Sequence, residues 1–435
     1  MSDIQIALSG LALMLLLLAL RTPIAVALGT ISFGGIWTLR GPSAAFGSIG
    51  HLPFEFASSW SLSAVPMFLL MGAAAFHTGL TGSLYAAARI FLNRLPGGLA
   101  VASNFASAGF AAASGSSLAT AAAMGRLAIP EMLKCGYDKG LATGTIAASG
   151  TLGALIPPSI AFVIYGWFTE QPIGLLLLAG IIPGLMTAAI YSIMILARCK
   201  VRPELAPKAE FTVTREDRIK AVKEVWPLPV LILGVVGSIY GGIATPTEAG
   251  AFGAFLCLLI GAVKGRLTTR VIADSFGEAL RTSAAIFFVA IGAILLTRFL
   301  AMAGVPAYVS GIVTSIDLTP LTVILLLTLV YMILGMFLDP LGLILLTLPI
   351  FLPVFEALDI DLIWVGVLVV KLIEIGLLTP PVGLNAYVVK GVVGDAVPLS
   401  TIFRGLVWFL ICEAIIMVLL IAFPEISLFL PNLSR

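Results

Sequence analysis

Two long apolar segments of the chain are each interrupted by a glycine that is followed by a pair of prolines. The first interruption runs from Gly153 to Ser159, and the second runs from Gly376 to Val382. Proline lacks a backbone donor and clashes with the preceding turn, so neither segment can form one continuous helix. In lipid, each backbone group freed by a break is costly unless it finds a partner. A matched pair of breaks is typical of secondary transporters that bind their ligands near the middle of the bilayer.

The overall composition is that of a membrane protein. Of the 435 residues, 60% are hydrophobic and 11% are charged, whereas roughly a quarter of the residues in a soluble domain are charged. The four cysteines and two histidines do not have metal-ligand spacing. Membrane lipid is therefore the expected surroundings, and the absence of a basic face with interleaved aromatic residues argues against a nucleic-acid partner. The glycine-rich stretches lack the Gly-Lys-Ser/Thr ending of a phosphate-binding loop, so ATP hydrolysis is not expected.

The basic residues predict which loops face the cytoplasm, because Lys and Arg concentrate on that side. They cluster at 89–94, 134–139, 198–223, 264–270 and 390–404, and they are absent from 41–88, 141–197 and 299–370. The segment 98–132 is therefore expected to begin and end inside, and the segment 320–358 to begin and end outside. No basic region precedes the first apolar stretch, Arg21 follows it, and no cleavage pattern is clear, so it is expected to remain as a span whose N-terminus lies outside.

A shift of 223 residues superposes the two halves of the chain. Besides the twin prolines, the matched pairs are Pro130 with Pro353, Asp138 with Asp361, and Ser116 with Asp339. Because the predicted orientations of the halves are opposite, this is an inverted-topology repeat.

The middle segments of the two halves, 98–132 and 320–358, are short for two full spans and a turn, since each span needs about twenty residues. Their centres are polar or helix-breaking, with Ser114–Ser117 in one and Asp339-Pro340 in the other. We predict a re-entrant helical hairpin in each half, entering from opposite sides. Two ordinary short spans that pack through small residues are the alternative.

The predicted fold is an all-α polytopic membrane protein with an inverted-topology repeat, two re-entrant hairpins and two discontinuous helices. We expect N-terminal scaffold spans in 1–58, a charged cytoplasmic loop in 198–225 and a central scaffold hairpin in 226–263. Repeat 1 is predicted in 59–197, with hairpin 98–132 and broken helix 141–166. Repeat 2 is predicted in 272–425, with hairpin 320–358, broken helix 362–391 and last span 406–423.

Each break is a candidate cation site. An unwound turn presents backbone carbonyls beside the negative end of the preceding half-helix, and nearby hydroxyls or a carboxylate complete an oxygen cage that suits Na⁺. The first predicted site consists of Ser114, Ser116, Ser117, Gly150, Thr151 and Gly153. The second consists of Asp339, Thr379, Pro381 through its carbonyl, Gly383 and Asn385.

Each break is also a candidate anion site. We expect the second half-helix to begin at the prolines, because proline suits the first helical turn. Its free N–H groups and positive dipole end would then bind an anionic substrate group. The predicted substrate-binding residues are Ser116, Pro157, Pro158, Ser159, Pro380 and Asn385.

Some of the predicted site residues could have a purely structural role in place of ligand binding. Asp339 lies in a long uncharged apolar run, where a carboxylate is a functional hypothesis by default; an aspartate before proline can equally cap a helix. The serines of 114–117 could instead serve close helix packing. Asn385 could be a ligand or the cap of the half-helix that follows the second break.

Other polar residues are expected to be structural. Lys371 and Glu374 are one turn apart and are predicted to form a salt bridge. Glu248 is predicted to lie in the first turn of a helix, and His77 to be an interior histidine whose hydrogen bonds are satisfied.

With these motifs the chain resembles the large membrane subunit of tripartite ATP-independent periplasmic (TRAP) transporters. The matching strings occupy 114–123, 129–132, 136–138, 153–160, 242–249 and 379–385. The resemblance implies a Na⁺-driven, elevator-type importer of organic acids in the bacterial inner membrane, with no cofactor other than the coupling ion. It also implies two partners, a small four-helix membrane subunit and a periplasmic substrate-binding protein.

Three other functions remain as alternatives. A stand-alone ion-coupled carboxylate carrier would need no binding protein. An intramembrane enzyme with a nucleophile in Ser114–Ser117 would need a nearby base, whereas His51 and His77 are expected to lie in an outer loop and in a separate helix. A channel would conduct without saturation.

Overall fold

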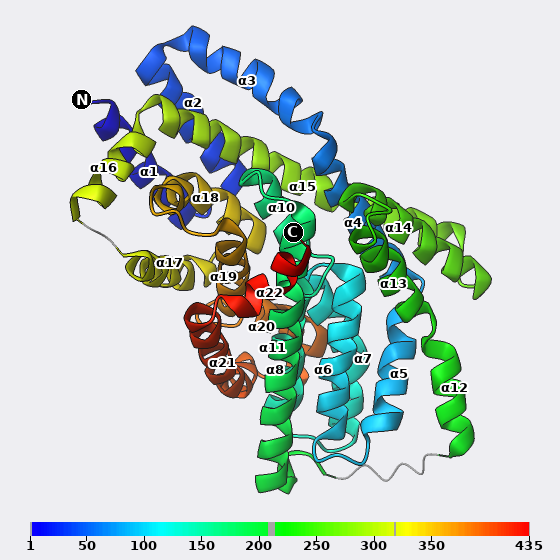
Figure 1. Ribbon diagram of the computed structural model, residues 1–435. Helices are drawn as coiled ribbons and strands as arrows, with labels where there is room; N and C mark the ends of the chain where they lie inside the picture. Colours follow the sequence, from blue (N-terminus) through cyan, green and yellow to red (C-terminus); the bar gives the residue numbers. More distant parts are fainter. Residues whose placement is uncertain (1, 208–213, 317–318, 435) are drawn as a thin grey trace.

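The computed structural model describes residues 2–207, 214–316 and 319–434, and within these ranges every regular element is a helix (Figure 1). Seven helical segments there are long and apolar enough to cross a membrane, and an eighth is formed if the bent pair Lys139–Leu155 and Ile160–Phe168 counts as one span. The seven are Trp60–His77, Ile173–Val201, Arg215–Tyr240, Pro246–Val263, Thr269–Met302, Pro340–Ala357 and Leu399–Ala422.

One group of helices is built around the long helix α15 (Thr269–Met302). Helix α2 (Ile24–Arg40) runs along α15, and α4 (Ala64–His77) packs against both α15 and α14 (Pro246–Val263). The remaining members are α1 (Asp3–Ala19), α3 (Pro42–Ala57) and α13 (Pro227–Tyr240). Helix α14 begins with a capping box of Thr245 and Glu248, which confirms the prediction that Glu248 lies in the first turn of a helix.

Repeat 1 contains a helical hairpin and a broken helix. The hairpin, hereafter hairpin 1, consists of α6 (Gly98–Ser114) and α7 (Ser117–Lys134), and the broken helix consists of α8 (Lys139–Gly150), α9 (Leu152–Leu155) and α10 (Ile160–Phe168). The turn of hairpin 1 forms where Gly115 has a φ of +61°, which favours glycine, and where Ser116 caps α7. Asp138 caps α8, and α11 (Ile173–Val201) follows the broken helix.

Repeat 2 has the same order of elements. Hairpin 2 consists of α17 (Pro320–Gly335) and α18 (Pro340–Ala357), and its broken helix consists of α19 (Leu362–Gly376) and α20 (Leu384–Val393), followed by α21 (Leu399–Ala422). Asp339 and Asp361 cap α18 and α19, as Ser116 and Asp138 do at the positions 223 residues earlier. The repeats are intertwined, because α20 packs on α7 and α21 packs on α8.

Three α-helices of the described structure, α12, α16 and α22, lie outside the predicted scheme. The segment predicted as a charged loop contains α12 (Arg215–Val225), which packs on α5 (Leu80–Leu92). Helix α22 (Glu425–Ser434) packs against α11 and α19 at the end of the described chain, and α16 (Val305–Ile316) precedes hairpin 2. Short 3₁₀ turns occupy Trp60–Ser63, Pro203–Leu205 and Gly394–Ala396.

Candidate functional site

The tip of hairpin 1 lies directly on the first helix break. The N–H of Ile160 donates a hydrogen bond to the carbonyl of Gly115 at 3.3 Å. The backbone at Gly153 approaches the tip so closely that an added Cβ would be 2.5 Å from the carbonyl oxygen of Ser116. Only glycine fits this contact, which explains why a glycine precedes the twin prolines.

The tip of hairpin 2 makes the equivalent contact with the second break. A Cβ added at Gly376, which is 223 positions after Gly153, would be 2.7 Å from the Cα of Gly335. The peptide bonds Pro157-Pro158 and Pro380-Pro381 are both cis. In each repeat, therefore, the hairpin backbone meets the broken helix at a glycine.

The structure brings the six predicted residues of the first cation site to one place, although not all of them face it. The Ser114 and Thr120 hydroxyl oxygens are 2.8 Å apart, and Thr120 donates to the Ser116 carbonyl at 2.8 Å. Sequence reasoning missed Thr120, whose position four residues after Ser116 on the same helix could have indicated it. Gly150 lies against the Ser117 carbonyl. Thr151 points away, and its hydroxyl donates to the Ala148 carbonyl at 2.6 Å.

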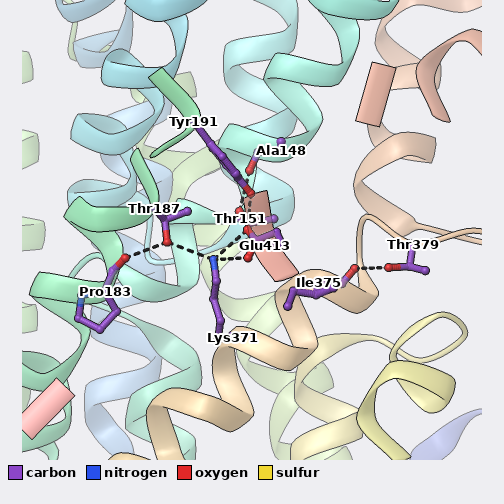
Figure 2. A network of polar contacts seen from close by, with 9 residues as sticks. All are labelled: Ala148, Thr151, Pro183, Thr187, Tyr191, Lys371, Ile375, Thr379 and Glu413. Atoms are coloured by element: carbon purple, nitrogen blue, oxygen red, sulfur yellow. Dashed lines mark hydrogen bonds and ion pairs between the residues drawn. The ribbon is translucent and has the colours of Figure 1, made fainter. Parts of the chain in front are cut away.

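The residues of the second predicted site are less tightly gathered. The Gly342 N–H donates to Asp339 Oδ2 at 3.0 Å, so the structure shows the capping role that was the alternative for Asp339. The Thr379 hydroxyl donates to the Ile375 carbonyl at 2.7 Å (Figure 2). Within the described ranges no hydrogen bond or ion pair joins Asp339 to Thr379 or Asn385.

Asn385 is fully buried and connects the two repeats. Its Nδ2 donates to the carbonyl of Ala147 on α8 at 3.1 Å, while its Oδ1 has no hydrogen-bond partner in the described structure. The cap of α20 is Gly383, with a φ of +60°, and Pro381 lies two residues before it. The prediction that Asn385 could cap this half-helix is therefore wrong, and an unpaired acceptor oxygen remains.

The half-helices do not begin at the prolines, contrary to the prediction. Helix α10 begins at Ile160 and α20 at Leu384, because each X-Pro step disfavours the helical conformation of the residue before it. The hydroxyl of Ser159 accepts from the Phe162 N–H at 3.3 Å and donates to the Ala154 carbonyl at 2.5 Å. Pro157, Pro158 and Ser159 are buried, whereas Pro380 and Pro381 are exposed.

A buried ionic network was not predicted from the sequence (Figure 2). The Lys371 Nζ is 2.6 Å from a carboxylate oxygen of Glu413 on α21 and donates to the Thr187 hydroxyl at 3.1 Å. The Tyr191 hydroxyl donates to the same carboxylate. All four side chains are fully buried. Lys371 therefore pairs with Glu413 and not with Glu374, which corrects the prediction. Glu413, a lone carboxylate in an apolar span, could have been singled out by the same argument as Asp339.

This pairing leaves Glu374 without a salt-bridge partner in the described structure. The side chain is 1% exposed, and its Oε2 has no hydrogen-bond partner among the described residues. The Ser117 hydroxyl lies beside the Glu374 carboxylate and can donate to it. Beyond this contact the buried Ser117 Oγ has no hydrogen-bond partner in the described ranges. The side-chain oxygens of Ser117 and Glu374, between hairpin 1 and α19, could therefore accept a further hydrogen bond or bind a cation.

Two cavities of the described structure differ in whether they reach the predicted site residues. The larger, of about 1010 Å³, is lined by residues such as Trp60, Trp167 and Arg298 and by none of the predicted site residues. The smaller, of about 310 Å³, reaches the tip of hairpin 1 at Ser114 and Ser116. We regard the smaller cavity as part of the site because it touches the hairpin tip.

His77 lines the smaller cavity, on the helix that faces hairpin 1. Its Nε2 is 2.8 Å from Glu278 Oε2, so its hydrogen bond is satisfied as predicted, although it is half-buried at a cavity wall. Within the described residues no hydrogen bond joins His77 to a serine of the tip. The arrangement therefore does not supply the base that a serine nucleophile would need.

Comparisons with known proteins agree with this architecture. The family model for the tripartite ATP-independent periplasmic transporter, DctM component, matches residues 11–426. The C4-dicarboxylate TRAP transporter large permease protein DctM of Pseudomonas aeruginosa is 36% identical, with 87% of this chain and 88% of that protein covered. The sialic acid TRAP transporter large permease protein SiaM of Vibrio cholerae is 34% identical, with 86% and 87% covered.

Two further similarities concern a longer protein and a solved structure. The isethionate TRAP transporter permease protein DctMQ of Oleidesulfovibrio alaskensis is 34% identical over 87% of this chain, which spans 59% of that protein. The YdaH transporter of Alcanivorax borkumensis superposes with a TM-score of 0.63 at 13% identity, covering 88% of this chain and 89% of the other, and so shares its fold.

The relatives are named as permeases, so this protein is a transporter subunit and not an enzyme. Its apolar helices and its relatives together place it in the bacterial inner membrane as a multi-pass protein. With a match over nearly its whole length, the chain belongs to the DctM family of TRAP transporter large permeases.

Proposed function

We propose that this chain carries organic acid anions into the cell by Na⁺ symport, as the transport subunit of a TRAP system. The observation that carries the proposal is the set of unpaired buried oxygens where the hairpins meet the broken helices. Ser117 Oγ, Glu374 Oε2 and Asn385 Oδ1 are all buried, and apart from the contact between Ser117 and Glu374 none of them has a hydrogen-bond partner in the described structure. Native proteins pair nearly all such atoms, so each calls for an explanation, and a bound cation is a direct one.

Charge balance supports a cation at the first break. With Glu374 ionised, the buried cluster of Lys371, Glu413 and Glu374 would carry one ammonium and two carboxylates, and one negative charge would be uncompensated. An unpaired buried charge is strongly unfavourable. A Na⁺ held by Glu374, the Ser117 hydroxyl and carbonyls of the tip would neutralise it. The other predicted ligands at this break remain Ser114, Ser116, Gly150 and Gly153, with Thr151 turned toward Tyr191.

The relatives support the class of substrate. Those named above carry C4-dicarboxylate, sialic acid and isethionate in their names, and all three are organic anions. A small membrane subunit and a periplasmic substrate-binding protein complete the proposed system. The relative named DctMQ is longer than this chain, as expected if a small subunit can be fused to the large one.

We propose an elevator movement for the transport step. The moving part consists of the two hairpins and the two broken helices, and the packing of α20 on α7 joins the two repeats within it. The fixed part consists of α2, α4, α14 and α15, which pack on one another. One charge that crosses a potential of about 100 mV releases about 2.3 kcal/mol, so two Na⁺ ions could drive substantial accumulation of an anion.

Reconstitution tests the proposal. The chain is placed in liposomes with its small membrane subunit and the binding protein encoded beside it, and uptake of labelled succinate, N-acetylneuraminate or isethionate is measured with an inward Na⁺ gradient. We expect saturable uptake of at least one of these anions that needs both Na⁺ and the binding protein. Equal uptake after K⁺ replaces Na⁺ would overturn the coupling, and Na⁺-driven uptake without the binding protein would instead indicate a stand-alone carrier.

A further inference from the structure

The smaller cavity has an unusual wall on the side of hairpin 1. Ser116, the cap of α7, lines it together with Ala119, Ala122, Ala123 and Arg126 of α7, and these residues recur at the spacing of one helical face. Small side chains fill most of that face, and a single long cation ends it. The opposite walls come from α4 and α15, with Phe76, His77 and Glu278 among the lining residues.

The cavity lies between the proposed moving and fixed parts. Its upper limit is the hairpin tip, where α4 touches α6 so closely that a Cβ added at Gly72 would be 2.9 Å from the Ser114 carbonyl oxygen. Its lower part lies along α7 toward Lys134, and both ends of hairpin 1 are expected on the cytoplasmic side. The cavity is therefore on the path between the tip and the cytoplasm.

Arg126 is the cation without an anionic partner in this cavity. Its guanidinium lies 5.7 Å from the centre of the Phe76 ring, and within the described chain it forms no ion pair. The carboxylate on the facing wall, Glu278, is bonded to His77 at 2.8 Å. The side chain of Arg126 is exposed to the space beside it. A guanidinium with free N–H donors is the group best suited to bind a carboxylate or a sulfonate.

We propose that Arg126 is an anion-binding residue of this cavity and holds the acidic group of the substrate between the hairpin tip and the cytoplasm. The inference rests on the proposed function for the class of substrate, an organic acid anion. Ser116 and Arg126 are ten residues apart, or about 15 Å along the helix axis. The Arg126 side chain leans back toward the tip, so the alanine-lined groove between them provides room for a small organic acid.

Cysteine accessibility tests the proposal without a known substrate. Ala122→Cys is introduced with Cys135→Ser, since the other three native cysteines are buried. Inside-out vesicles are treated with an anionic reagent, 2-sulfonatoethyl methanethiosulfonate, or with the cationic 2-(trimethylammonio)ethyl analogue. The quantity measured is the labelling rate of Ala122→Cys with the anionic reagent divided by its labelling rate with the cationic reagent. A fixed cation attracts the anionic reagent and repels the cationic one, so we expect Arg126→Gln to lower this ratio by about tenfold or more. Arg126→Lys keeps the charge and should preserve most of the ratio.

A matched control uses Val201→Cys, which is exposed at the end of α11, and whose rate ratio should not change with Arg126→Gln. Succinate and isethionate should also slow labelling at position 122 when Arg126 is present and not in Arg126→Gln. A ratio unaffected by Arg126→Gln, or no labelling with either reagent, would overturn the proposal. The measurement needs no Na⁺, so a failure of Na⁺ coupling and a failure of this inference are distinguishable.

Discussion

At the scale of single residues, the ion pair of Lys371 and Glu413 dominates the core. Both side chains have no exposed surface, and Thr187 and Tyr191 complete the hydrogen bonds. Such a pair adds little stability beyond that of a well-packed apolar pair, yet removing one partner leaves a buried charge. The network therefore fixes the relative positions of α11, α19 and α21.

Glu413→Gln should destabilise the protein by roughly 3–5 kcal/mol, because it removes the carboxylate that is paired with the buried Lys371 ammonium. Lys371→Met combined with Glu413→Leu should recover most of that loss. Thermal unfolding in detergent checks both variants, and Glu356→Gln, at an exposed position of α18, is the control. A small effect of Glu413→Gln alone would mean that the pair is not desolvated.

Asp339→Asn separates the two roles of this residue. Asparagine caps helices about as well as aspartate, so the hydrogen bond from Gly342 should persist and the melting temperature should stay within a few degrees. If Asp339 is also a Na⁺ ligand, as we propose, Na⁺-dependent uptake in proteoliposomes should be lost. Wild-type uptake at low Na⁺ would leave Asp339 with its capping role alone.

At the scale of elements, each hairpin is positioned by one glycine of the broken helix beneath it. Gly153 and Gly376 are equivalent in the two repeats, and both face hairpin backbone. Backbone cannot rotate away as a side chain can, so a methyl group at either position must displace the tip.

Gly153→Ala and Gly376→Ala should each abolish most transport while the protein still inserts, because the added Cβ would lie 2.5 and 2.7 Å from tip backbone atoms. Gly237→Ala, where an added Cβ meets nothing within 4 Å, is the matched control and should be neutral or slightly stabilising. The test is to measure uptake by each variant and to divide it by the amount of that variant in the membrane. Full activity of the Gly153 and Gly376 variants would show that the tips tolerate displacement.

Much of the fold at this scale could be predicted from local sequence. The hairpin helices begin and end within a few residues of the predicted limits, because Gly115, Ser116 and Asp339 act through turns and caps that depend on neighbouring residues. The predicted starts of the half-helices are too early by a few residues, since the N-caps of α10 and α20 are Ser159 and Gly383 and not the prolines.

At the scale of the whole molecule, the parts that could not be predicted are contacts between distant segments. The partner of Lys371 is 42 residues away on α21, whereas the sequence offers Glu374 one turn away on the same helix. Asn385 donates to Ala147, 238 residues earlier. Such pairings depend on how the repeats intertwine, and a 223-residue shift shows that the repeats exist without showing which helix of one packs on the other.

The same intertwining makes the hairpin tips move as one body in the proposed elevator, which leads to a test on Ser116. In this structure Ser116 lines the smaller cavity, so Ser116→Cys should react from the cytoplasmic side with a thiol reagent that does not cross membranes. When Na⁺ and a transported anion are added, occupancy of the site and movement of hairpin 1 past α4 and α15 should slow labelling by severalfold. Val201→Cys, at the end of α11, should react equally in both conditions. A Ser116→Cys protein that is inert in every condition, while Val201→Cys still reacts, would contradict the placement of the tip at the head of an inward path.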